Sequence, residues 1–317
     1  MRVLFLLSLV TGSLLTGVAT GIASAQADLP AALDQIAAAE LSRQKIPGFA
    51  AAVVKDDRVV WDAGLGVSSL ESKLPVTPDT LFRLGSARVF LAAAISELSS
   101  QGRVQLAAPA GDYLFGLDDK QARLSAEALL SPPSESGEEA VAARLIENIR
   151  ARPAPAVLDE MIFSPLGMTH TTFSPSVAMT YPLAMGHTSD GQVRRPMEVG
   201  GIFTTASDLA RFLVVFLNDG KVGDILDQRQ VLPHTVIAAL SSDSGYGLDA
   251  DASRGIRLIR QTSTAPGFTA AILMAPEFHT GVVVLANRDG VSAITIAQKL
   301  LERSLPVRFP QALAALH

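Results

Sequence analysis

The stretch TLFRLGSARVF, residues 80–90, leads into a strongly apolar helical pattern over residues 90–102. Ser86 therefore stands at a predicted helix start. When a lysine follows such a serine three positions later, the amine and the hydroxyl lie on one helical face and the amine can take the hydroxyl proton. Here the third residue after Ser86 is Val89, which has no proton chemistry. Arg88 is two positions on, roughly 200° round the helix at ~100° per residue, and its guanidinium stays protonated.

Composition restricts the classes of protein to which the chain can belong. Its 317 residues are 48% hydrophobic, enough for one large core. The net charge is −5 with acidic and basic residues interspersed, so no nucleic-acid partner is expected. The absence of cysteine excludes disulfides, thiolate catalysis and lipoprotein acylation. No histidine or carboxylate spacing indicates a metal site, and no cofactor is expected.

Residues 1–25 have the pattern of a cleavable signal peptide. One basic residue precedes an apolar run, and ASA at 23–25 has the small-x-small form that signal peptidases cleave. AQA at 25–27 is an equally good frame, so the mature chain is expected to begin at Gln26 or Asp28. Polar and glycine residues interrupt the run, which favours cleavage over a retained membrane anchor. The expected location is the periplasm or the cell exterior, without a stable membrane anchor after cleavage.

The order of predicted elements indicates the fold class. Strands are expected over 49–54, 59–61, 255–260, 268–274 and 281–286, and helices over 29–45, 90–102, 137–150, 156–162, 208–217 and 292–304. The GLG at 64–66 is interpreted as sheet edge rather than as a phosphate loop, because no helix follows it. We predict an α+β fold: an antiparallel sheet from both chain ends, flanked by helices, with a shortened helical insert at about 90–220. The single domain spans 28–307, and a tail follows at 308–317.

Several short landmarks occur in an order and spacing typical of one superfamily. They are VTPDTLFRLGS at 76–86, the helix end at 98–102, PLGM at 165–168, GGIFTTASDLA at 200–210, YGL at 246–248, PGF at 266–268 and VVLANR at 283–288. In these the chain resembles the serine β-lactamase and penicillin-binding-protein superfamily, on the branch of class C β-lactamases, D-alanyl-D-alanine peptidases and esterases. The resemblance covers nearly the whole mature chain and implies the β-lactamase/transpeptidase-like fold.

The resemblance implies a Ser-x-x-Lys motif, from which the sequence departs. Alignment on residues 90–95 places Arg88 at the lysine position and Gly85 at the nucleophile position. Alignment on Gly85 and Ser86 instead places Val89 at the lysine position. One residue has been lost, and neither register gives a serine–lysine pair.

The two other motifs that the resemblance implies are also missing. The Tyr-x-Asn motif has no counterpart, because no tyrosine occurs between residues 114 and 180. Gln261, Thr262 and Ser263 replace the Lys-Thr-Gly or His-x-Gly motif. This removes the cation that would hold a substrate carboxylate, and the glycine that lets substrate approach the strand.

The remaining candidates have both functional and structural interpretations. Ser86 is a candidate nucleophile, but an unaided serine hydroxyl is weak, and serine is also favoured at helix starts for capping. Arg88 is expected to fill the vacated site and pair with a carboxylate, of which Asp79 is the nearest in sequence. Residues 261–263 are expected to face the groove or solvent. The five histidines, His187 among them, are expected in solvated loops.

Three interpretations of function stay open. The favoured one is an exported, catalytically degenerate relative with a binding or structural role, because three independent losses are harder to rescue than one. Its expected ligand is a small molecule or a cell-wall peptide. The alternative is a divergent serine hydrolase of the esterase, β-lactamase or D-Ala-D-Ala peptidase type with Ser86 as the acylated nucleophile. The third is a product without a selected role.

Overall fold

The computed structural model describes residues 29–131, 136–195, 201–223, 227–242, 246–251 and 256–306. The expected signal peptide at 1–25 and the expected tail at 308–317 lie outside these residues, so their assignment stays a prediction. None of the helices in the described ranges is both long and apolar enough to cross a membrane.

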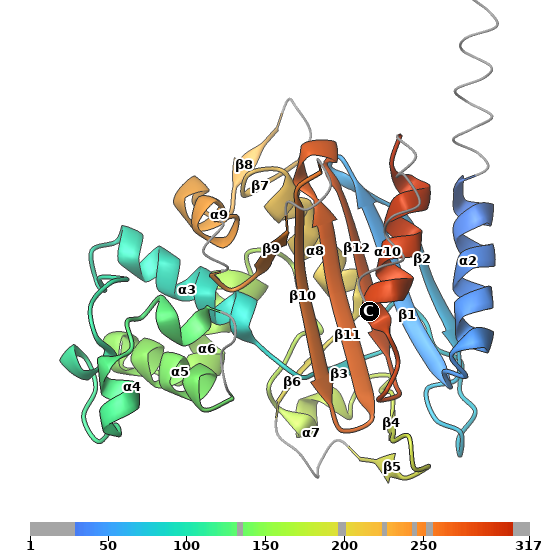
Figure 1. The fold of residues 1–317 in the computed structure, drawn as a ribbon, viewed down its shortest axis with the longest axis horizontal. Helices are drawn as coiled ribbons and strands as arrows, with labels where there is room; N and C mark the ends of the chain where they lie inside the picture. Colours follow the sequence, from blue (N-terminus) through green and yellow to red (C-terminus); the bar gives the residue numbers. More distant parts are fainter. Residues whose placement is uncertain are drawn as a thin grey trace, which may run out of the picture.

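An antiparallel sheet of six strands forms the centre of the fold, in the order β2-β1-β12-β11-β10-β9 (Figure 1). The strands are β1 (Gly48–Lys55), β2 (Arg58–Gly66), β9 (Asp249–Asp251), β10 (Leu258–Ala265), β11 (Phe268–Ala275) and β12 (Thr280–Ala286). The two chain ends meet where β1 pairs with β12, with Ala51 opposite Val284. The predicted sheet from both chain ends is confirmed, and the glycines at 64–66 lie in the edge strand β2.

Helices cover both faces of the sheet (Figure 1). The first and last helices, α2 (Leu29–Arg43) and α10 (Ala293–Ser304), lie on one face, and α8 (Ala206–Leu217) lies on the other. In β12, Val282 and Val284 join the cluster under α2 and α10, whereas Val283 joins the cluster under α8. Burial on both faces explains why the central strands are continuous apolar runs rather than alternating ones.

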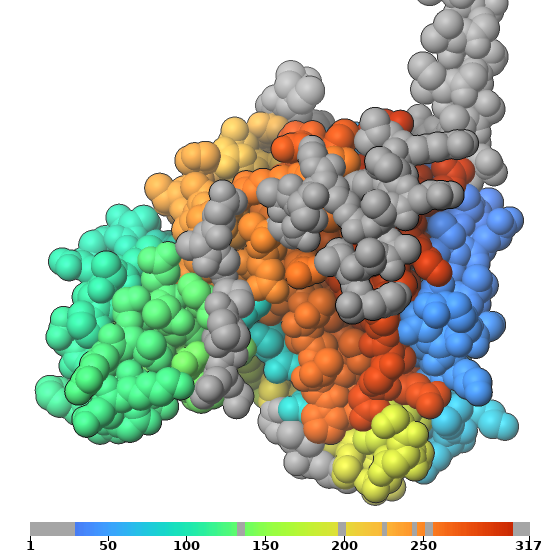
Figure 2. All heavy atoms as spheres, in the orientation of Figure 1, coloured from blue at the N-terminus to red at the C-terminus, as the bar shows by residue number. Residues whose placement is uncertain are grey.

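A helical lobe, α3 to α6, projects beside the sheet; Figure 2 shows it in teal and green next to the orange strands. The helices outside the sheet layers are α3 (Arg88–Ser100), α4 (Asp119–Arg123), α5 (Ser136–Arg150), α6 (Ala154–Leu158), α7 (Pro175–Ala178) and α9 (His234–Leu240). The short elements are β3 (Phe82–Leu84), β4 (Gly186–His187), β5 (Val193–Arg194), β6 (Ile202–Thr204), β7 (Lys221–Val222), β8 (Arg229–Gln230), η1 (Ala110–Asp112), η2 (Ala128–Leu130), η3 (Asp159–Phe163) and η5 (Pro276–Phe278). Although α8 falls within the range predicted as the insert, it packs on the sheet.

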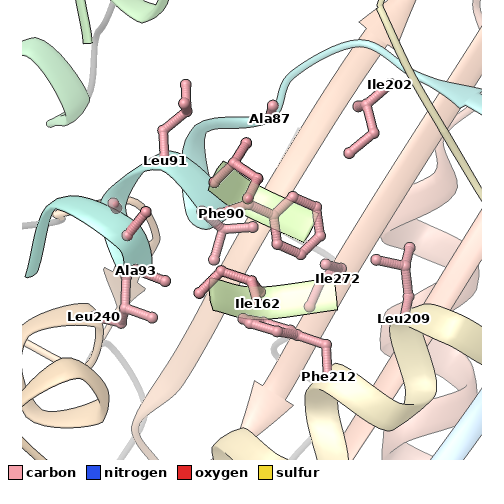
Figure 3. Packing of buried hydrophobic residues seen from close by; sticks show 14 of the residues in the cluster. Ala87, Phe90, Leu91, Ala93, Ile162, Ile202, Leu209, Phe212, Leu240 and Ile272 are labelled. Atoms are coloured by element: carbon pink, nitrogen blue, oxygen red, sulfur yellow. The ribbon is translucent and has the colours of Figure 1, made fainter. Parts of the chain in front are cut away.

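Phe90 fixes the start of α3 between the lobe and the sheet layers. Its buried ring makes edge-to-face contacts with Phe163, at a centroid distance of 5.1 Å, and with Phe212 of α8, at 5.4 Å. Figure 3 shows Phe90 among aliphatic side chains from α3, α8, α9 and β11. The segment that follows Ser86 is therefore held on a rigid support.

His187 is buried, contrary to the solvated loop position expected from sequence; it is 4% exposed. Its Nδ1 lies 3.0 Å from the Asn287 carbonyl oxygen, which can only accept, so Nδ1 carries the proton. Nε2 accepts from the Leu70 N–H at 3.3 Å. Both ring nitrogens are thus used in joining β4, the end of β12 and the 68–75 loop.

Candidate functional site

Ser86 lies in the short connection between β3 and α3, partly buried. The N-cap of α3 is Ala87, and the Ser86 hydroxyl oxygen accepts a hydrogen bond from the Arg88 N–H at 3.2 Å. Ser86 therefore satisfies a free N–H of the first helical turn, as the structural interpretation expects.

Glu139 of α5 is the closest polar partner of Ser86. The Ser86 hydroxyl donates to Glu139 Oε1 at 2.5 Å, and the Ala87 N–H donates to Oε2 at 3.2 Å. Sequence reasoning missed Glu139, because it lies 53 positions away on a helix predicted from periodicity alone. No motif marks it, and only the docking of α5 against the start of α3 brings the two together.

The strand that replaces the third motif contributes two of its three residues to the site. Gln261 Nε2 lies 3.4 Å from the Ser86 hydroxyl oxygen, and the Ser263 hydroxyl oxygen accepts from the Gly85 N–H at 3.3 Å. Both side chains are buried, whereas Thr262 between them is exposed on the opposite face of β10. The structure thus brings Gln261 and Ser263 to the serine but not Thr262.

Arg88 is directed to an acidic residue of the edge strand rather than to the serine side chain. Its Nη2 lies 3.2 Å from Asp249 Oδ1 on β9, and only 11% of the Arg88 side chain is exposed. The expected pairing with a carboxylate is present, and the carboxylate is that of Asp249 rather than Asp79. The two residues are 161 positions apart, so only the tertiary fold reveals the pair.

Gly85 makes the closest backbone approach at the site. A Cβ built on Gly85 would lie 2.1 Å from the Thr264 carbonyl oxygen of β10. No other residue fits there without moving the strand or the loop. In the alignment that puts Gly85 at the nucleophile position, the structure therefore leaves no room for a nucleophilic side chain.

A cavity of about 280 Å³ opens beside Ser86 between α5, α6 and the start of α3. Its lining is mainly apolar: Leu84, Gly85, Ser86, Ala87, Leu91, Glu139, Ala140, Ala143, Glu147, Ala154, Pro155, Leu158, Phe173, Gly201 and Ile202. Figure 3 labels three of these residues, Ala87, Leu91 and Ile202. A small organic molecule would fit in this volume.

The hydrogen bonds around Ser86 fill the capacity of its hydroxyl. A serine hydroxyl has one proton and two acceptor lone pairs. The proton goes to Glu139, and the Arg88 N–H and Gln261 Nε2–H point to the oxygen. In this arrangement both acceptor positions of the hydroxyl oxygen therefore face a donor. Within the described ranges, no group of three or more metal-ligating side chains is present either.

Solved structures with the same fold come from bacteria and archaea. The octameric penicillin-binding protein homologue from Pyrococcus abyssi superposes with a TM-score of 0.74 at 20% identity, covering 88% of this chain and 78% of that one. The D-alanine carboxypeptidase from Burkholderia cenocepacia gives a TM-score of 0.71 at 21% identity, covering 88% of this chain and 100% of that one. At these identities the likeness concerns the fold.

Sequence relatives and a family model extend the comparison. A β-lactamase from Pseudomonas fluorescens is 22% identical, covering 83% of this chain and 94% of the relative. The unguisins hydrolase of Aspergillus violaceofuscus is 23% identical over 83% of this chain, which spans only 62% of that relative's length. The Beta-lactamase family model matches residues 33–131 and 135–303. With the fold and the landmark motifs in agreement with this match, the chain belongs to the Beta-lactamase family.

Proposed function

We propose that this protein is an exported member of its family that binds a small molecule or cell-wall peptide without turning it over. The observation that carries the proposal is the saturated hydroxyl of Ser86, which has no amine beside it. Val89 is fully buried at the lysine position of one alignment. Arg88, at the lysine position of the other, points to Asp249. The family's serine–lysine proton transfer has no route here.

The direct test is covalent labelling. The purified protein is incubated with a fluorophosphonate and with a fluorescent penicillin, and its intact mass is measured. We expect no adduct, whereas a family carboxypeptidase with an intact Ser-x-x-Lys, treated in parallel, becomes labelled. Any hydrolysis of nitrocefin or a p-nitrophenyl ester should be the same in Ser86→Ala. An adduct that maps to Ser86 and disappears in Ser86→Ala would overturn the proposal.

One specific contact supports a second candidate, a divergent serine hydrolase. Glu139 lies within proton-transfer distance of the Ser86 hydroxyl, at 2.5 Å. In this alternative the Glu139 carboxylate takes the proton while Ser86 attacks an ester or amide carbonyl. Protonated Glu139 then gives the proton to the departing alcohol or amine as the C–O or C–N bond breaks, and the cavity holds the acyl group left on Ser86. Gln261 and the Arg88 N–H would have to move off the serine oxygen first.

The two candidates differ in the effect of Glu139→Gln. Glutamine keeps the size of the side chain but cannot accept a proton as a carboxylate does. In the hydrolase, labelling of Ser86 would fall by about 10²–10⁴-fold, the usual contribution of a general base. In the non-catalytic protein, the wild type and Glu139→Gln remain equally unlabelled.

Export has its own test. The pattern of residues 1–25 supports cleavage after Ala25 or Ala27. Protein recovered from a cell envelope should begin at Gln26 or Asp28 by N-terminal sequencing. An intact Met1 on that protein would contradict export with cleavage.

A further inference from the structure

The cavity beside Ser86 is acidic. Glu139 and Glu147 are its only titratable lining residues among those the structure describes, and no described lysine, arginine or histidine lines it. The guanidinium of Arg83 lies close to one lining residue, Gly201: a Cβ built on Gly201 would lie 3.1 Å from Arg83 Nε. This charge is opposite to what a carboxylate-bearing ligand requires.

The two carboxylates belong to one face of α5. Glu139, Ala143 and Glu147 follow one another at intervals of four residues, and all three line the cavity. Eight residues of helix correspond to about 12 Å along the axis. The acids thus mark two ends of an elongated space, and Ala143 leaves room between them.

Apolar side chains form the opposite walls. Leu91 of α3, Leu158 of α6 and Phe173 face the cavity with Ile202 of β6. A molecule lying along α5 would therefore contact hydrocarbon in its middle and carboxylate at each end.

Both carboxylates keep acceptor capacity for a ligand. A carboxylate offers about four lone-pair sites. Glu139 uses one site on each oxygen, for Ser86 and Ala87. Glu147 Oε1 accepts from the Ala154 N–H at 2.9 Å, and its Oε2 has no hydrogen-bond partner in the described part of the chain. An ammonium group at either end would gain charge-assisted hydrogen bonds.

We propose that this cavity binds a linear aliphatic diamine, with one ammonium group at Glu139, the other at Glu147 and the methylene chain along Ala143. The proposal rests on the binding function proposed above and specifies its ligand class. It reverses the charge of the family site, in which a cation holds a substrate carboxylate.

Isothermal titration of the wild-type protein with matched five-carbon probes is the first test. Cadaverine should bind, and pentanediol and glutarate of similar length should not, because neither presents a cation to the acids. Pentylamine, with a single ammonium group, should bind about 10-fold or more weakly than cadaverine. Added salt should weaken cadaverine binding. Equal binding of cadaverine and pentanediol, or no binding of cadaverine, would overturn the proposal.

Charge-neutralising variants are the second test. Glu147→Gln and Glu139→Gln should each weaken the binding of cadaverine by about 10-fold or more. Each change should bring the affinity for cadaverine close to the affinity for pentylamine. The matched control is Glu277→Gln, an exposed residue of η5 outside the cavity, which should bind cadaverine like the wild type. Circular dichroism and thermal melts establish that each variant is folded. Unchanged affinity for cadaverine in both folded cavity variants would overturn the proposal. If a variant fails to fold, the probe series with the wild-type protein decides the proposal instead.

The outcome is separable from that of the proposed function. The same samples are exposed to the fluorophosphonate, and the intact mass of the protein is measured. A Ser86 adduct in protein that binds cadaverine would overturn the non-catalytic function but leave the ligand class standing. A protein that is not labelled and does not bind cadaverine would overturn the ligand class alone.

Discussion

Gly85 and Ser86 are adjacent in the chain but are held by different constraints. Gly85 is fixed by shape, because a Cβ at this position would lie only 2.1 Å from the carbonyl oxygen of Thr264. Ser86 is fixed by hydrogen bonds, to Glu139 and from the Arg88 N–H. At this scale the hydroxyl of Ser86 is paired on every side, whereas the buried Oε1 of Gln261 has no hydrogen-bond partner in the described part of the chain.

Gly85→Ala should destabilise the protein by about 1–3 kcal/mol, the usual cost of overpacking. The added methyl group would collide with backbone, which cannot rotate away as a side chain can. Gly137→Ala is the matched control: it lies in the first turn of α5, and its nearest neighbour to a new Cβ is 3.8 Å away. That change should be neutral or stabilise by up to about 1 kcal/mol. Urea unfolding of both variants measures the difference, and equal stabilities would contradict this account.

The contents of the site could be predicted only in part from these residues. Ser86, Gln261 and Ser263 came from aligning motifs, and the structure brings them together. Glu139 and Asp249 could not be predicted, because their roles arise from the packing of α5 and β9 against the start of α3. The motif alignment places Thr262 in the groove together with Gln261 and Ser263, but successive side chains of a strand alternate between its two faces, so Thr262 faces away from Ser86.

At the scale of elements, Glu40 links the two helices that cover the outer face of the sheet. Its side chain is 3% exposed and accepts hydrogen bonds from Arg43, the last residue of α2, at 2.6 Å and from Gln44, the next residue, at 2.9 Å. Lys299 of α10 is its third partner. Burial raises the pKa of Glu40, but the three hydrogen bonds outweigh burial and lower the pKa from 4.5 to about 2.

The acid stability of the fold should depend on this link. Because the folded-state pKa is lowered, the contribution of Glu40 is complete above pH 4.5 and is lost as the pH falls towards 2. The contribution should be about 3 kcal/mol, because one pKa unit corresponds to about 1.4 kcal/mol. Glu40→Gln should therefore be less stable than the wild type at pH 7, and the gap should close between pH 4.5 and 2 in thermal melts. Glu277→Gln serves as the control, and a gap that stays constant with pH would contradict this mechanism.

At the scale of the whole molecule, periodicity and residue order were sufficient to predict the architecture. The strands β1, β11 and β12 and the helices α2, α5, α8 and α10 begin and end within two residues of the expected positions, whereas β2 and β10 each extend five residues beyond the predicted end. Helix limits shifted where local geometry decides: α3 begins at Arg88, and α6 continues into the wider turn η3. Those changes depend on caps and contacts that no sequence pattern records.

Restoring the first motif should not restore turnover. One residue inserted between Ala87 and Arg88, together with Arg88→Lys, recreates the Ser-x-x-Lys spacing. The new amine would meet the carboxylate of Glu139, which favours the charged, non-basic form of lysine. We expect slow acylation by fluorescent penicillin at most, and no steady-state hydrolysis of nitrocefin. Adding Glu139→Gln should raise the acylation rate, whereas robust turnover by the first variant would show that the remaining groove is competent.

The close approach of Gly85 to β10 also bears on solubility. β9 pairs only with Leu258, Ile259 and Arg260, so in the described part of the chain the rest of that β10 edge has no strand partner. An open strand edge invites pairing between molecules and aggregation. The loop that carries Gly85 and Ser86 lies against this edge at Thr264 and Ser263. This loop therefore covers part of an edge that would otherwise be open to self-association of the folded protein, a role that does not depend on any reaction at Ser86.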